Sequence, residues 1–126
     1  MKYLLVLVML VALPAWAWEY VDTEIESRNQ YFLNLETLRT DGNIKRTWQL
    51  INLAKVDEYG WRSLRARVEF DCKNETRQTL SYTAFSESFA DGKVLFQNNT
   101  VSAKTDIAPE TVGWSLLQKV CKAPTR

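Results

Sequence analysis

The chain has 126 residues, which is enough for one domain. Sixteen Lys and Arg residues face fifteen Asp and Glu residues, so the formal net charge is +1, and there is no histidine. The balanced charge excludes a global field for binding nucleic acid or anionic membranes, and the missing histidine excludes Ser-His-Asp and Cys-His catalytic sites.

The first 17 residues have the pattern of a secretory signal peptide. A positive start at Lys2 is followed by the apolar run LLVLVMLVAL and then by Ala15-Trp16-Ala17, a small-residue pattern that signal peptidase accepts. We expect residues 1–17 to be removed and residues 18–126 to form a single domain. An uncleaved membrane anchor is the alternative, but the apolar run is shorter than the roughly 20 residues that span a bilayer.

The expected destination is the periplasm, the cell surface or the medium. After cleavage we expect no transmembrane segment. No cysteine lies near the cleavage point, so we expect no lipid anchor either.

The rest of the chain has the pattern of short strands separated by turns. We expect strands near residues 18–25, 29–35, 44–54, 63–72, 77–85 and 94–97, with turns near 40–43, 57–60, 73–76 and 90–93. The segment NLETL at 34–38 fits either one helical turn or a loop. Consecutive hairpin signals predict an antiparallel sheet.

Residues 63–72 alternate between apolar and polar side chains, which predicts a strand with one buried face. Near the end of the chain, Pro109 suits a first helical turn and Glu110 complements the helix dipole. An apolar stripe at helical spacing follows, formed by Val112, Leu116, Leu117, Val120 and Cys121. We therefore predict an α+β fold, with about six antiparallel strands and a C-terminal helix packed on one face.

The two cysteines, Cys72 and Cys121, lie on the apolar faces of the predicted strand and helix. An even pair in an exported chain predicts a disulfide. A redox-active thiol pair or a metal site is the alternative. The first usually has C-x-x-C spacing, and the second needs more ligands than a chain without histidine offers.

The sequence contains no catalytic motif and no nucleotide-binding glycine motif, and we expect no cofactor and no metal. Glu69 and Asp71 are a carboxylate pair on one strand face, with a spacing compatible with acid–base chemistry. A solvated strand face is the simpler explanation of the pair, and it is the one we favour.

A candidate binding surface contains Trp61, Arg65 and Arg67, which alternate outward on the strand that carries the buried row. Lys45 or Arg46 is expected nearby, on a neighbouring strand. An aromatic residue beside arginines has the composition of interface hot spots, and a basic stripe suits heparin-like polymers or an acidic partner. The alternatives are an ordinary solvated face for the arginines and packing under a loop for Trp61.

Four segments carry a resemblance to a known family: YFLNLETLRTDGNIKRTW, WRSLRARVEFDC, TLSYTAFS and IAPETVGWSLLQKVC. In this order they resemble the surface-adhesin protein E family of Gram-negative bacteria over roughly residues 18–121. The resemblance implies a small antiparallel sheet closed by a C-terminal helix with bridged cysteines. It also implies a role as an adhesin that binds host extracellular-matrix and serum proteins, with a homodimer as one arrangement.

Two functions are therefore consistent with the sequence. The first is an exported, non-enzymatic and adhesin-like module that binds a host extracellular or envelope protein, with no nucleic acid as partner. The second is a soluble periplasmic enzyme or small-ligand carrier that uses carboxylates. A flat surface favours the first, and a deep pocket with two inward carboxylates favours the second.

Overall fold

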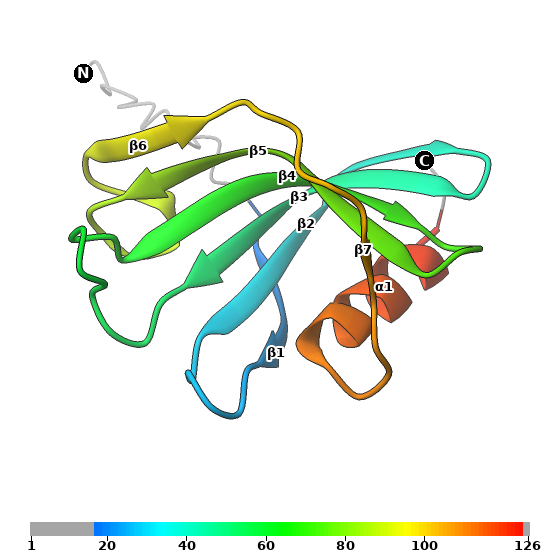
Figure 1. Cartoon of the computed structure of the whole chain (residues 1–126), viewed down its shortest axis with the longest axis horizontal. Helices are drawn as coiled ribbons and strands as arrows, with labels where there is room; N and C mark the ends of the chain where they lie inside the picture. Colours follow the sequence, from blue (N-terminus) through cyan, green and yellow to red (C-terminus); the bar gives the residue numbers. More distant parts are fainter. Residues whose placement is uncertain (1–16, 125–126) are drawn as a thin grey trace, which may run out of the picture.

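The computed structural model describes residues 17–124 and shows an antiparallel sheet closed on one face by a single α-helix (Figure 1). The elements are β1 (Glu19–Thr23), β2 (Gln30–Asp41), β3 (Ile44–Asn52), β4 (Ser63–Asp71), β5 (Thr76–Phe85), the 3₁₀ turn η1 (Ser88–Ala90), β6 (Val94–Asn98), β7 (Thr105–Asp106) and α1 (Val112–Lys122). Strands β1 to β6 pair in chain order, and β7 adds two residues beside β5. The predicted α+β fold is confirmed.

The main core lies between the sheet and α1. Ala66, Val68 and Phe70 of β4 are buried there, as the alternating pattern predicts. Leu116, Leu117 and Val120 supply the helix side of the same cluster. α1 covers only one end of this face, and the β5–β6 end extends beyond it (Figure 1).

The helix begins later than its sequence suggests. Thr111 is the N-cap, and its Oγ1 accepts a hydrogen bond from the N–H of Trp114 at 3.2 Å. Pro109 and Glu110 therefore precede α1, and Glu110 has a positive φ of 65° that no first helical turn contains. The predicted roles of Pro109 and Glu110 in the first turn are wrong. The helix starts instead after Thr111, because its side chain caps the N–H of Trp114.

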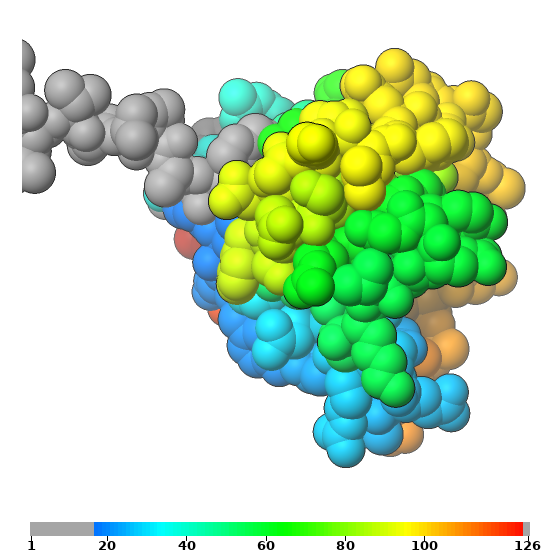
Figure 2. Space-filling model, turned by 90° about the vertical axis from the view of Figure 1, so that its left-hand side faces the viewer, coloured from blue at the N-terminus to red at the C-terminus, as the bar shows by residue number. Residues whose placement is uncertain are grey.

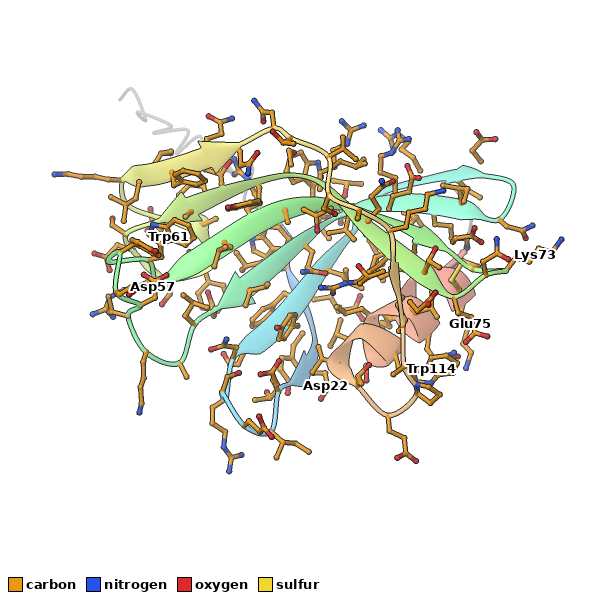
Figure 3. All side chains as sticks on the ribbon, in the orientation of Figure 1. Asp22, Asp57, Trp61, Lys73, Glu75 and Trp114 are labelled. Carbon is orange, nitrogen blue, oxygen red and sulfur yellow. A yellow bond between two sulfur atoms is a disulfide. The ribbon has the colours of Figure 1, made fainter. Side chains whose placement is uncertain are left out.

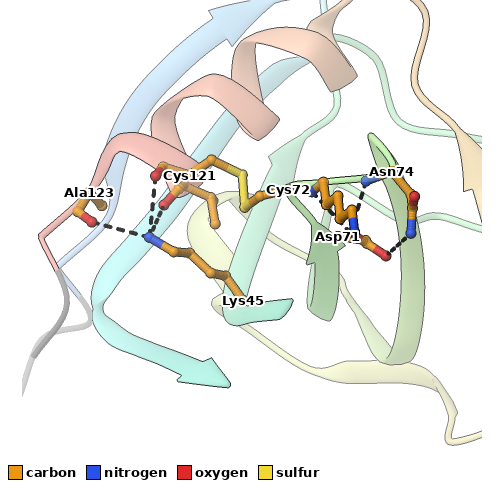
Figure 4. Close-up of a disulfide and its surroundings, with 8 residues drawn as sticks. Lys45, Asp71, Cys72, Asn74, Cys121 and Ala123 are labelled. Carbon is orange, nitrogen blue, oxygen red and sulfur yellow. Dashed lines mark hydrogen bonds between the residues drawn. A yellow bond between two sulfur atoms is a disulfide. The ribbon is translucent and has the colours of Figure 1, made fainter. Parts of the chain in front are cut away.

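The disulfide predicted between Cys72 and Cys121 is present, with Cα atoms 5.8 Å apart (Figure 4). It joins the residue after β4 to the last turn of α1. Beside it, the buried ammonium of Lys45 on β3 donates to the carbonyl oxygens of Val120, Cys121 and Ala123 at 3.3–3.4 Å. A covalent bond and a charged cap thus fix the same end of the helix.

A second, smaller core on the opposite face was not predicted. The turn η1 covers it, with the ring of Phe89 packed 5.3 Å from that of Phe32. Ser63 is fully buried beneath this turn, where its Oγ donates to the carbonyl of Glu87 and accepts from the N–H of Ala90. Because Ser63 is polar and is buried to form hydrogen bonds with the backbone of a loop, the sequence pattern of apolar residues does not reveal this core.

The segment at 34–38 is neither a helical turn nor a connecting loop, but a bulged part of β2. The register between β2 and β3 shifts between Asn34 and Arg39. Thr37 and Thr47 donate hydroxyl hydrogen bonds to the carbonyl of Asn34 at 2.7 and 2.8 Å, which replaces backbone pairing lost in the bulge.

Candidate functional site

Trp61 lies just before β4, at a β-bulge that places its ring on the α1 side of the sheet. Ser63 pairs with Phe85 of β5, and the backbone N–H of Arg62 donates to the carbonyl of the same Phe85 at 2.9 Å. Arg62 and Ser63 therefore both lie opposite Phe85 of β5. The alternation of side chains between the two faces of the sheet shifts by one residue at this point. The structure corrects the prediction that Trp61 continues the outward row of β4.

Trp61 belongs to an aromatic cluster with Tyr59, Tyr82 and Phe96. Its ring centroid lies 5.4 Å from that of Phe96 in a stacked arrangement and 6.3 Å from that of Tyr82. Tyr59 approaches Trp61 to 5.4 Å from the β3–β4 turn. Contacts of this kind add to the stability that burial of the rings already gives.

The turn that carries two of these rings is held by Asp57. Its Oδ1 accepts from the N–H groups of Tyr59 and Trp61 at 2.9 and 2.8 Å. Figure 3 shows Asp57 and Trp61 at the end of the sheet that is remote from α1 and Trp114. The carboxylate of Asp57 is therefore a structural group of the turn.

Exposed apolar side chains lie within this cluster and beside it. On β6, Val94, Leu95 and Phe96 are 58%, 42% and 43% exposed, and Tyr59 is 66% exposed. Among the strands that the structure describes, none pairs with the outer edge of β6. Figure 2 shows this end of the molecule, where the green β3–β4 turn lies beside the yellow β6 region. We call Tyr59, Trp61, Val94, Leu95 and Phe96 the aromatic edge.

Arg65 lies on the opposite face and packs between two rings. Its guanidinium carbon is 5.6 Å from the centroid of Trp48 and 5.2 Å from that of Phe85. Burial lowers the pKa of Arg65 from its ordinary value. The side chain thus combines cation–π contact with packing of its aliphatic stem.

Arg67 lies two residues further along β4, exposed, and faces Trp48 across the β3–β4 ladder. Of the two basic residues expected nearby, Arg46 shares this face, whereas Lys45 points into the core.

A hollow of about 250 Å³ is lined by Thr37, Arg39, Arg46, Thr47, Trp48 and Arg67. We call it the arginine hollow. The predicted site residues are therefore divided, with Trp61 on one face and Arg65 and Arg67 on the other.

Glu69 and Asp71 are both engaged in structural contacts. Glu69 accepts from Arg46 Nη2 at 3.1 Å. Asp71 accepts from the backbone N–H groups of Asn74 and Lys73 and from Asn74 Nδ2, at 2.9–3.0 Å, within the β4–β5 turn (Figure 4). The hydrogen bonds from Asn74 hold the pKa of Asp71 below its ordinary value. The two carboxylates are thus not arranged as an acid–base pair.

A separate hollow of about 380 Å³ lies between β1 and the start of α1. Four acidic residues line it: Asp22, Glu24, Glu26 and Glu110. Asp22 Oδ2 accepts from Ser115 Oγ at 2.8 Å, which ties β1 to the helix. Within residues 17–124, no group of three or more His, Cys, Asp or Glu side chains is arranged to hold a metal ion.

Comparison with known proteins gives the family. Residues 18–122 match the family described as surface-adhesin protein E. The chain belongs to this family. Membership in the surface-adhesin protein E family places the chain among adhesin-like surface proteins and favours a non-enzymatic role. No curated protein matches the chain.

Solved structures of protein E from Haemophilus influenzae have the same fold. Crystal form II has a TM-score of 0.64 at 18% identity, over 81% of this chain and 86% of that chain. The selenomethionine form has a TM-score of 0.62 at 17% identity, over 81% and 84% of the two chains. The protein from the non-typeable strain has a TM-score of 0.60 at 18% identity, over 81% and 74%. At these identities the likeness establishes a shared fold.

Within residues 17–124, no helix combines the length and the apolar character that a membrane crossing requires.

Proposed function

We propose that this member of the surface-adhesin protein E family is exported after removal of residues 1–17 and acts as a non-enzymatic binding module. Its partner is a protein, either a host extracellular protein or a component of the bacterial envelope. The proposal rests on family membership together with the composition of the aromatic edge.

The aromatic edge is the observation that carries the proposal. It combines an exposed row on β6 with the stacked pair Trp61 and Phe96. Apolar side chains are normally dispersed on a monomer's surface, and a contiguous group marks an interaction site. Tryptophan and tyrosine are also enriched at the centres of protein interfaces.

The position of this group favours a protein partner. β6 is the last strand of the sheet, so its outer N–H and C=O groups are available to an added strand. An extended partner segment can form backbone hydrogen bonds with β6 while its side chains contact Phe96 and Leu95. A second copy of the chain is one partner of this kind, and sedimentation analysis separates it from a foreign partner.

The test uses the mature protein, beginning at Trp18, and a panel of purified extracellular-matrix and serum proteins. Binding is measured by surface plasmon resonance for the wild type and for Phe96→Ser. If Phe96 is a hot spot, its truncation weakens binding by about 30-fold or more. Gln97→Ser is the matched control, because Gln97 is an exposed neighbour on the same strand.

Two results would contradict the proposal. Absence of binding across the panel, together with protection from protease added to intact cells, would exclude the host-directed role. Equal binding by wild type and Phe96→Ser would exclude the aromatic edge as the contact surface. For the alternative of a carboxylate-based enzyme, the pair that the sequence suggested gives no support, since Glu69 and Asp71 are both engaged in structural contacts.

A further inference from the structure

The arginine hollow collects cationic side chains from three adjacent strands. Arg39 of β2 and Arg46 of β3 are direct register partners, so they face each other on one side of the sheet. Arg67 of β4 is the register partner of Trp48, which lies two residues from Arg46. From ordinary sheet spacings, the Cα atoms of Arg46 and Arg67 are roughly 8 Å apart.

Only part of this positive charge is neutralised within the described residues. Arg46 has one ion pair, with Glu69. Arg39 donates from Nη1 to the carbonyl of Leu38 at 3.3 Å, and Arg67 makes no ion pair with any residue between 17 and 124. Like charges placed directly opposite each other destabilise a sheet, so the pairing of Arg39 with Arg46 has a cost that a bound anion would remove.

Two further acidic residues lie on this face, at its hairpin end. Asp41 and Asp71 are in register with Ile44, beyond Arg46 toward the β2–β3 hairpin. Asp71 is held there by Asn74, as described above. Their negative charge disfavours an anion at the hairpin end and favours one that lies across β3 and β4, over Arg46 and Arg67.

The floor of the hollow is fixed by the bulge in β2. The hydroxyls of Thr37 and Thr47 both donate to the carbonyl of Asn34, and Thr37 Oγ1 accepts from the N–H of Trp48 at 3.4 Å. The bulge thus removes residues 35–38 from regular pairing with β3 and leaves a depression between the arginines. A regular β2 would give a flat sheet surface at this point.

We propose that the arginine hollow binds a sulfated, linear polysaccharide of the glycosaminoglycan class. Planar guanidinium groups bind sulfate and carboxylate oxygens in a bidentate manner. Arg39, Arg46 and Arg67 come from three adjacent strands and step diagonally across the sheet, which suits a chain with repeated anionic groups. This inference is independent of the aromatic edge, whose stacked rings, Trp61 and Phe96, lie on the other face of the sheet.

The topology favours a polysaccharide over an acidic peptide. β3 and β4 are interior strands, with both edges paired, so they offer no backbone hydrogen bonds to an extended peptide. Contacts must come from side chains, and the guanidinium groups are the principal donors. A formal net charge of only +1 for the whole chain means that binding depends on this local cluster rather than on a general field.

The test measures binding of a heparin octasaccharide to the mature protein by calorimetry at low and moderate salt. We expect Arg39→Gln and Arg67→Gln each to weaken binding by about threefold to fivefold and to reduce its salt dependence. Arg67→Lys keeps the charge but loses bidentate contact, so its affinity should lie between those of wild type and Arg67→Gln. Arg28→Gln is the charge-matched control, in the exposed β1–β2 turn, and should bind like wild type.

Two further ligands test which kind of anionic polymer the arginine hollow prefers. An unsulfated oligosaccharide of equal length, carrying carboxylates only, should bind more weakly than heparin, and a poly-glutamate peptide should bind most weakly. If poly-glutamate bound more tightly than the heparin octasaccharide, the proposal would be overturned in favour of an acidic peptide. Absence of heparin binding, or equal weakening by Arg28→Gln and Arg67→Gln, would also overturn it. Phe96→Ser should leave heparin binding unchanged, which separates this result from the test of the aromatic edge.

Discussion

Lys45 of β3 donates from its ammonium group to the carbonyl oxygen of Ala123, 3.3 Å away and just beyond the end of α1. The same ammonium also reaches the carbonyls of Val120 and Cys121. The last carbonyls of a helix have no partners within it and carry partial negative charge. A buried lysine from the sheet therefore caps the helix across the core.

Replacement of Lys45 by Met should lower the free energy of unfolding by about 1–3 kcal/mol. The methionine fills the space of the aliphatic stem but leaves three carbonyl groups without their charged donor. Thermal and denaturant unfolding measure the change. Lys55→Met, at an exposed position between β3 and β4, is the control and should have little effect. A Lys45→Met protein as stable as wild type would show that water satisfies these carbonyls equally well.

Loss of the Cys72–Cys121 disulfide should destabilise the protein more strongly. The bridge closes a loop with a sequence separation of 49 residues, and removal of a native disulfide from a small exported domain costs about 2–5 kcal/mol. The double variant Cys72→Ser/Cys121→Ser avoids a free thiol and isolates this effect in denaturant unfolding. Mass spectrometry of the wild type without reductant should detect no free thiol. Equal unfolding midpoints with and without reductant would contradict the prediction.

The inner face of β4 and the cysteine pair could be predicted from the sequence because each depends on a short-range pattern. Ala66, Val68 and Phe70 repeat every second residue, and Cys72 and Cys121 each continue the apolar face of their own element. Neither inference requires knowledge of a distant segment. The antiparallel character of the sheet followed in the same way, from turn signals between neighbouring strands.

The candidate site was only partly predictable because its geometry depends on contacts between distant residues. The face of Trp61 is set by the bulge at Arg62 and Ser63, which forms against Phe85. The pairing of Arg39 with Arg46 depends on the register that follows the bulge in β2. A local period-two pattern contains no information on either shift, so it placed Trp61 on the wrong face and did not identify Arg39.

Cleavage of the exported chain should occur between Ala17 and Trp18. Residues 1–16 lie outside the part of the chain that the structure describes, so this prediction rests on the apolar run and on Ala15-Trp16-Ala17. N-terminal sequencing of protein recovered from the periplasm or medium should begin at Trp18. Ala17→Lys should block cleavage and leave the precursor in the membrane fraction, while Ala12→Ser should be processed normally. An intact Met1 on the wild-type protein would support a membrane anchor instead.

Stability at alkaline pH should depend on Tyr31 of β2. Burial raises the pKa of this tyrosine above its ordinary value of 10.0, and the charge of Glu24 raises it further, while Arg77 acts in the opposite direction. The unfolded chain therefore loses the phenolic proton at a lower pH than the folded chain. Between pH 10 and the raised pKa, the folded chain keeps the phenolic proton that the unfolded chain has lost, so the free energy of unfolding falls as pH rises. Below pH 10 the stabilisation that this pKa difference gives is fully present.

The variant Tyr31→Phe tests this dependence, because it keeps the ring and removes the ionisable group. Its free energy of unfolding should fall less steeply than that of wild type above pH 10, although lysine titration affects both proteins equally. Glu24→Gln should lower the pKa of Tyr31 without restoring the ordinary value, since burial, the larger cause, remains. Ultraviolet titration of the phenolate measures that pKa directly, with Tyr59→Phe, which removes an exposed tyrosine, as the control. Parallel pH profiles for wild type and Tyr31→Phe would show that Tyr31 titrates alike in the folded and unfolded states.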